Sequence, residues 1–139
     1  MEQTKKKNGI AAVIIGVILS YLLSTFFFKT SVEEKLAKWA TNINKTCPTM
    51  VDEFTQIDSV AVPKGSRTIK YYYSISNIDE ENLDLDIAYT EMREVLLNGI
   101  KTSSELKILK DNDVTFDYLY FNKNREKLME ISISPAEYK

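Results

Sequence analysis

The side chains of this 139-residue chain that could do acid–base chemistry are carboxylates and phenols. The sequence contains no histidine and one cysteine, so it offers no Ser-His-Asp triad, no Cys-His pair and no multi-thiolate zinc site. Asp52, Asp58 and Tyr72 could in principle form an acid–base site, but nothing nearby in the sequence would separate the pKa values of the two carboxylates. We therefore predict no catalytic residue and no enzymatic activity.

Acidic residues also gather at positions 79–86, but this stretch lacks the central glycine and the terminal glutamate of a calcium-binding loop. The four glycines form no run that could cradle a phosphate, so we expect neither a metal nor a cofactor. From Thr30 onward there are 19 Asp and Glu against 14 Lys and Arg, a net charge of 14 − 19 = −5. An acidic domain releases no counterions from a phosphate backbone, which argues against nucleic acid as a partner.

An uncharged apolar segment near the start predicts a membrane location. Residues 10–28 carry no charge, and as a helix they span about 28 Å, enough to cross a bilayer core. The segment ends in three phenylalanines, where a cleaved secretory signal would carry small residues. Lys5, Lys6 and Lys7 favour a cytoplasmic N-terminus, although Lys29 weakens the asymmetry. The alternatives are a cleaved signal and a buried helix of a soluble protein.

The predicted organisation is a basic cytoplasmic tail at 1–8, a transmembrane helix at 9–28 and an extracytoplasmic domain at 29–139. The expected location is the bacterial cytoplasmic (inner) membrane, crossed once, with the domain outside. The side chains expected to anchor the helix in lipid are Ile10, Ile14, Val17, Leu22, Phe26 and Phe28. Gly16 and Ser20, a small-xxx-small pair, would allow two helices to associate, so a homo-oligomer is one expectation. Cys47 is interpreted as a packed thiol, with a disulfide between two copies as the alternative.

The periodicity of the remaining residues predicts an α+β domain. Ser31 and Glu34 form a capping-box pattern before a helix that ends near Lys45. Two alternating segments, 55–62 and 68–76, predict a hairpin around Pro63–Gly65, and a helix closed by Gly99 follows the acidic stretch. A short helical turn comes next, then a second hairpin, with Pro135 ending the last strand. The predicted order is α-β-β-α-β-β, giving a four-stranded antiparallel sheet with helices packed on one face.

Tyrosines are the most informative residues for binding. Tyr71 and Tyr73 alternate with Tyr72, so Tyr72 points to the opposite face of its strand. Amphipathic rings suit both sheet packing and recognition. We predict an interaction surface at Tyr72, Leu119 and Phe121.

The segment from Pro48 to Asp58 spells P-x-M-V-D-x-x-T-x-x-D and precedes the tyrosine-rich strand. In this pattern the chain resembles a group of small bacterial membrane-anchored or exported proteins, and it departs from that group at Cys47. The resemblance implies a bacterial envelope location and no activity. We therefore predict a membrane-tethered envelope protein whose outer domain is a protein-interaction or structural module. The alternative is an exclusion or immunity protein that neutralises a toxin or a phage component.

Overall fold

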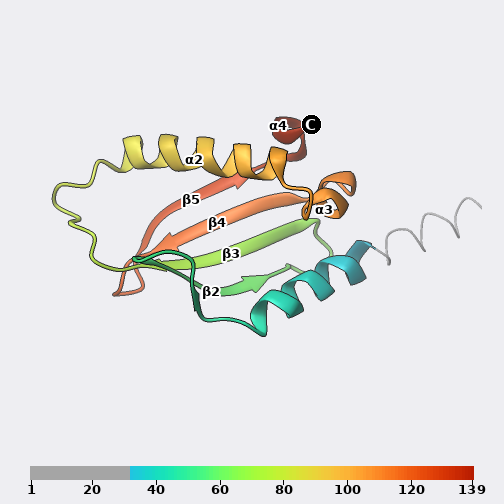
Figure 1. Cartoon of the computed structure of the whole chain (residues 1–139), viewed down its shortest axis with the longest axis horizontal. Coiled ribbons are helices and arrows are strands. Elements are labelled where there is room, and N and C mark those ends of the chain that lie inside the picture. The colour runs from blue at the N-terminus through green and yellow to red at the C-terminus, as the bar shows by residue number, and fades with distance from the viewer. Residues whose placement is uncertain (1–31) are drawn as a thin grey trace, which may run out of the picture. The chain divides into compact units, whose positions relative to one another are not determined.

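The structure is a computed structural model that describes residues 32–139, and residues 35–139 form one compact unit (Figure 1). The predicted membrane anchor at 9–28, the capping residue Ser31 and the Gly16–Ser20 pair lie outside the described residues. Within residues 32–139, no helix combines the length and the apolar character needed to span a bilayer.

Five strands form one mixed sheet in the order β1-β2-β3-β4-β5. They are β1 (Thr49–Met50), β2 (Thr55–Ala61), β3 (Thr68–Ile75), β4 (Thr115–Phe121) and β5 (Lys127–Ile133). The β1–β2, β2–β3 and β4–β5 pairs are antiparallel, whereas β3 and β4 are parallel. The predicted four-stranded antiparallel sheet is therefore wrong in strand number and in the direction of one pair.

The parallel pair follows from the connection between β3 and β4. An 18-residue helix, α2 (Leu85–Thr102), and a five-residue helix, α3 (Lys107–Asp111), join these strands. At about 1.5 Å per residue α2 is about 27 Å long, so it carries the chain back to the end of the sheet where β3 began. Period-two alternation is the same for parallel and antiparallel partners, and for that reason it could not reveal the direction.

The helices begin and end close to the predicted positions, with one exception at Gly99. The first described helix covers 32–44. Asp84 caps α2, because its carboxylate accepts hydrogen bonds from the amides of Asp86 and Ile87. The helix does not close at Gly99 but continues to Thr102.

A fourth helix, α4 (Pro135–Tyr138), was not predicted. Ser134 and Glu137 form a complete capping box around it, and Pro135 occupies the first turn, where its missing N–H costs nothing. Pro135 thus ends β5 as expected and also starts a helix. The Ser134–Glu137 spacing was the signal for that helix.

The core lies on one face of the sheet, which we call the helix-covered face. The indole of Trp39, in the 32–44 helix, donates a hydrogen bond of 3.1 Å to the hydroxyl of Tyr71. Tyr138 of α4 packs edge-on against Phe116, with ring centroids 5.8 Å apart. The other buried side chains of the sheet on this face are Ile57, Val60, Ile69, Tyr118, Tyr120, Ile131 and Ile133.

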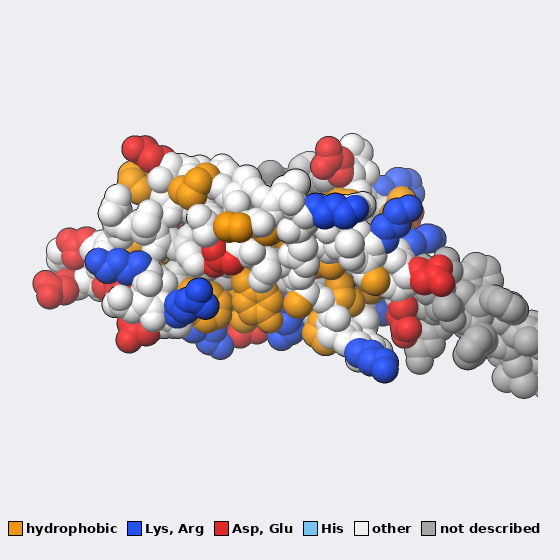
Figure 2. Space-filling model, turned by 90° about the horizontal axis from the view of Figure 1, so that it is seen from below, with side chains coloured by type: hydrophobic (Ala, Val, Ile, Leu, Met, Phe, Trp, Pro, Cys, Tyr) orange, Lys and Arg blue, Asp and Glu red, His pale blue; other side chains and the backbone are white. Residues whose placement is uncertain are grey.

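Apolar residues that remain exposed include a group in the β1–β2 segment, made by Met50, Val51 and Phe54. On the face drawn in Figure 2, apolar side chains form small groups set among Lys, Arg, Asp and Glu. Among described residues the most exposed large apolar side chain is Val95 of α2, at 72 %. Figure 1 shows α2 running alongside β5, with the 32–44 helix on the β2 side of the sheet.

Candidate functional site

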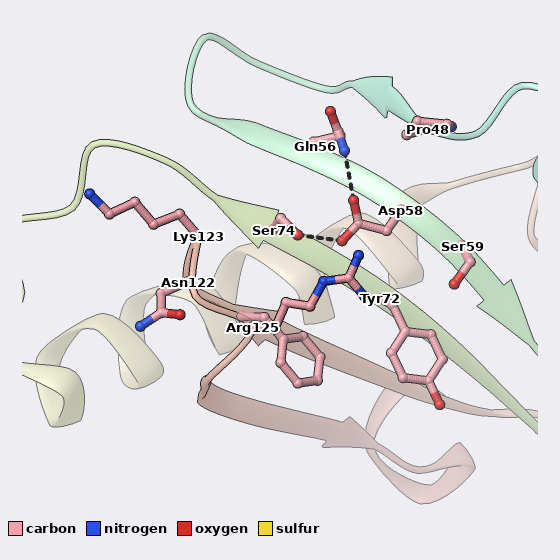
Figure 3. Close-up of a pocket in the computed structure, with 10 residues that line it drawn as sticks. Pro48, Gln56, Asp58, Ser59, Tyr72, Ser74, Asn122, Lys123 and Arg125 are labelled. Atoms are coloured by element: carbon pink, nitrogen blue, oxygen red, sulfur yellow. Dashed lines mark hydrogen bonds between the residues drawn. The ribbon is translucent and has the colours of Figure 1, made fainter.

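The other face of the sheet, the open face, carries a pocket of about 620 Å³. Polar side chains of β2 and β3 line one side of it, and residues at the end of β4 and in the β4–β5 turn line the other (Figure 3). The lining residues are Pro48, Gln56, Asp58, Ser59, Tyr72, Ser74, Phe121, Asn122, Lys123 and Arg125. Its volume lies within the range of about 300–1,000 Å³ that is usual for ligand pockets.

A bulge in β2 shapes the first wall of the pocket. Ile57 pairs with Tyr73, but the next paired residue is Ser59, opposite Tyr72, so Asp58 is the extra residue. Because of this extra residue, Asp58 and Ser59 both line the pocket. Ile57 and Val60 still reach the helix-covered face, although three positions separate them. That spacing in the sequence was the sign of a bulge.

Hydrogen bonds hold Asp58 in place. The Gln56 side-chain amide donates to one carboxylate oxygen at 2.7 Å, and the Ser74 hydroxyl donates a short hydrogen bond to the other. Figure 3 shows both bonds, with the Asp58 carboxylate between the two strands. The carboxylate is thus oriented by neighbours on its own sheet face.

An aromatic pair forms a second part of the pocket. Tyr72 of β3 and Phe121 of β4 stack with ring centroids 6.3 Å apart and planes 22° apart. Both rings are half-buried, so an apolar surface remains accessible beside the polar wall. Such aromatic surfaces are frequent at protein contacts.

The β4–β5 turn supplies the basic part of the site. Lys123 and Arg125 are exposed, and Figure 3 shows the Arg125 side chain reaching across the pocket toward Asp58. The buried Asn122 fixes the turn, because its side-chain oxygen accepts the amides of Asn124 and Glu126 at 2.9 Å each. Its side-chain nitrogen donates to Glu126 and to Glu80. The turn is therefore tied to the loop that precedes α2.

The predicted interaction residues come together at this site. Tyr72 and Phe121 are pocket-lining neighbours, and Leu119 lies directly opposite Tyr72 in the parallel ladder. The Leu119 side chain, however, is only 7 % exposed, so it supports the surface from below. Whether this surface binds a partner stays a prediction.

The acid–base site considered for Asp52, Asp58 and Tyr72 is only partly assembled. Asp58 and Tyr72 share the pocket, whereas Asp52 does not line it. The Asp52 carboxylate accepts the backbone amides of Phe54 and Thr55 at 2.8 Å each, and these bonds lower its pKa. Asp52 thus organises the β1–β2 turn. Within residues 32–139, no three His, Cys, Asp or Glu side chains are grouped as metal ligands.

Cys47 is partly exposed, and the pKa of its thiol is raised by burial and by the negative charge of Asp58. A raised pKa reduces the thiolate fraction, which is the reactive form. Because the thiol is partly exposed, the alternative of a disulfide between two copies stays a prediction.

A family model, described as domain of unknown function DUF8479, matches residues 31–129. The chain belongs to the DUF8479 family. The matched residues include the whole pocket, from Pro48 to Arg125. A comparison with curated proteins finds no match.

Solved structures similar to this DUF8479 domain show where else the fold occurs. A Pseudomonas aeruginosa protein described as secreted has a TM-score of 0.67 at 12 % identity, over 80 % of this chain and 96 % of its own. The type 2 secretion pilotin EpsS of Vibrio vulnificus has a TM-score of 0.65 at 7 % identity, over 80 % and 94 %. The type II secretion pilotin AspS of Vibrio cholerae has a TM-score of 0.57 at 12 % identity, over 78 % and 94 %. At these identities the likeness concerns the fold of the DUF8479 domain.

Inspection of the DUF8479 sequence missed several residues of the site. Gln56, Ser74 and Arg125 are ordinary polar residues whose meaning depends on a bulge and a parallel strand pair. The polar residues 122–125 predict the turn between the last two strands, but not the four hydrogen bonds that the buried Asn122 side chain makes. An asparagine at the start of a tight turn was the available signal.

Proposed function

We propose that this protein is a bacterial envelope protein, held at the cytoplasmic membrane by its apolar N-terminal segment, whose outer domain binds another envelope protein. The observation that carries the proposal is the open-face pocket with its accessible Tyr72–Phe121 pair. The open face lies opposite the helix-covered core, so it can take a partner without disturbing that core. The role is that of a binding module, without catalysis.

Two further observations support a binding role. The fold is shared with two pilotins of type II secretion systems and with a protein described as secreted. The sequence also lacks histidine, the commonest general base, and its single cysteine has a raised pKa. A protein partner in the same envelope is the simplest occupant of the site.

In-cell cross-linking of the full chain tests this function. A photoreactive residue is placed at Tyr72 or Phe121 in the pocket, and at Val95 on α2 as an equally apolar, more exposed control. We expect positions 72 and 121 to capture the same envelope protein and position 95 not to capture it. The captured protein, once purified, should bind the full chain, and Tyr72→Ala should weaken that binding.

Capture of nothing at positions 72 and 121, or of the same proteins at position 95, would contradict the binding role. The membrane attachment is tested separately by sequencing the N-terminus of the mature chain and by washing membranes at high pH. A mature chain that begins beyond Phe28, or that leaves the lipid fraction, would contradict the tether and leave the pocket untouched.

A further inference from the structure

The pocket holds two cations that form no close ion pair within the described part of the chain. Five ion pairs occur among residues 32–139, and neither Lys123 nor Arg125 belongs to any of them. The carboxylate within the pocket, Asp58, is already hydrogen-bonded by Gln56 and Ser74. Asp58 keeps its negative charge, so the lining of the pocket carries two cations and one carboxylate, a net charge of 2 − 1 = +1.

Two carboxylates near the β4–β5 turn, those of Glu80 and Glu126, are hydrogen-bonded to Asn122. Glu80 and Glu126 both accept hydrogen bonds from the buried Asn122 side chain, at 2.9 Å and 2.8 Å. These bonds hold the two acidic side chains on the turn itself, where they fix its backbone. The turn thus presents Lys123 and Arg125 on a rigid support.

Arg125 has a left-handed backbone conformation, which glycine and asparagine adopt more easily than arginine. Its φ is +64°, and the Arg125 amide donates to the Asn122 carbonyl at 3.0 Å, which is the geometry of a tight turn followed by a left-handed residue. Glycine or asparagine adopts this conformation most easily, and a residue with a Cβ does so at a cost of about 1–2 kcal/mol. An arginine at such a position indicates a use for its guanidinium.

The apolar surface lies beside these cations. Phe121 is the last residue of β4, one residue before the turn, and its ring stacks on Tyr72. A ligand that reaches the guanidinium of Arg125 can therefore also contact an aromatic ring. Guanidinium groups bind carboxylates through two parallel hydrogen bonds, which makes arginine selective for this group.

We propose that the pocket binds a segment of the partner protein that carries an Asp or Glu side chain next to an aromatic or aliphatic one. Arg125, assisted by Lys123, binds the carboxylate, and the Tyr72–Phe121 pair contacts the apolar side chain. This inference rests on the proposed function, because it names the chemistry of the partner at the same site. Charge complementarity favours an acidic partner, since the lining of the pocket carries one more positive charge than negative.

Selection from a displayed peptide library tests the proposal. The full chain in detergent is the target, and Arg125→Glu, Arg125→Gln, Tyr72→Ala and Lys64→Glu are parallel targets. Lys64 is an exposed lysine of the β2–β3 turn and does not line the pocket. Lys64→Glu therefore makes the same charge reversal as Arg125→Glu without altering the site. Circular dichroism confirms that each variant is folded.

We expect the full chain to enrich peptides with Asp or Glu beside an apolar residue. Arg125→Gln should bind these peptides about tenfold more weakly, a difference of about 1.4 kcal/mol, and Arg125→Glu should not retain them. Lys64→Glu should bind them as the natural chain does. In NMR spectra the bound peptide should shift the amides of Ser59, Ser74 and Lys123.

Peptides that require Tyr72 but show no acidic enrichment, or that bind Arg125→Glu equally well, would overturn the acidic-segment proposal and leave the proposed function standing. If no selected peptide depends on Tyr72, both proposals fail. If short-chain phosphatidylglycerol shifts the pocket amides and the peptides do not, the anion is a lipid head group and the proposal is overturned.

Discussion

The two faces of the sheet are made by alternate residues of the same strands, yet they have different properties. On β3, Tyr71 and Tyr73 point to the helix-covered face and Tyr72 points to the open face. Tyr71 is 7 % exposed and accepts a hydrogen bond from Trp39, whereas Tyr72 lines an open pocket. Three consecutive residues of one type therefore divide between a buried face and an accessible one, according to what covers them.

Stacked rings extend across the helix-covered face. Tyr71 and Tyr118 lie 5.2 Å apart at 11°, and Tyr73 and Tyr120 lie 5.1 Å apart at 16°. Pairs of this kind contribute about 0.5–1.5 kcal/mol each beyond the burial of their area. The open face has one such pair, Tyr72–Phe121, with rings left accessible. If this contrast is correct, changes on the first face should affect stability and changes on the second should affect binding.

The largest effect should come from ionising the stacked phenols. Burial raises the pKa of Tyr73 and Tyr118 well above the ordinary value of 10.0 and raises that of Tyr120 to about 12. The folded state keeps protons that the unfolded state releases above pH 10, so these groups support folding fully below pH 10. Their contribution falls as pH rises from about 10 to 12, by up to about 1.4 kcal/mol per pH unit for each group. Phenolate absorbance and circular dichroism should change together in this range.

Early phenolate formation by these tyrosines in a chain that keeps its folded spectrum would contradict their burial. Tyr118→Phe is a matched variant that removes one phenol and keeps the ring. Its unfolding in alkali should begin at a higher pH than that of the natural chain.

A comparison of two phenylalanines on β4 should give the next largest effect. Phe116 is fully buried on the helix-covered face and Phe121 is half-buried on the open face. Phe116→Ala should lower the free energy of unfolding by about 3–5 kcal/mol, because it leaves a cavity against Tyr138. Phe121→Ala should cost less than half of that and should weaken partner binding. Urea denaturation measures both, and equal losses for the two variants would contradict the division between the faces.

The turn that supports the basic side chains should respond to loss of Asn122. Asn122→Ala leaves the amides of Asn124 and Glu126 without their acceptor, so we expect a loss of about 1–3 kcal/mol in urea denaturation. Asn124→Ala, at an exposed position of the same turn, is the matched control and should change stability by less than about 0.5 kcal/mol. Similar values for the two variants would show that Asn122 does not organise the turn.

The smallest expected effect is an increase in the free energy of unfolding, whereas the changes above decrease it. Arg125→Gly removes the left-handed strain at φ +64° and should raise the free energy of unfolding by about 1 kcal/mol, while weakening binding of the acidic segment. Arg125→Ala keeps the strain and loses the guanidinium, so it should weaken binding without the gain in stability. Thermal denaturation of the two variants separates these contributions. A loss of stability in Arg125→Gly would show that the arginine is retained for folding.

Patterns of single segments were predicted well. The expected strands at 55–62 and 68–76 correspond to β2 and β3, and the turn between them has Gly65 at φ +75°. Asp84 caps α2, the helix that was predicted to follow the acidic stretch at 79–86. Such features depend on residues within a few positions of one another, and for that reason a sequence displays them directly.

Features that depend on distant partners were predicted poorly. The two-residue strand β1 exists because Thr49 and Met50 pair with Ile57 and Gln56, and no two-residue pattern could indicate it. Asn44 and Thr46 match the tripeptide pattern of a glycosylation acceptor, but the Asn44 side chain instead donates to the carbonyl and accepts the amide of Val60, both at 2.8 Å. Asn44 thereby supplies hydrogen-bond partners for backbone groups at the edge of β2. This role depends on a strand residue 16 positions away in the sequence.

The sequence by itself determined which residues alternate, where helices start and that Tyr72 and Tyr71 face opposite ways, because backbone geometry sets these properties locally. Only the tertiary structure decided that β3 and β4 run parallel, that Asp58 bulges into the open face and that Arg125 lies beside Phe121. Those three facts place residues from three separate segments in one pocket. They follow from how the chain returns across the sheet, which long-range packing selects and local pattern does not encode.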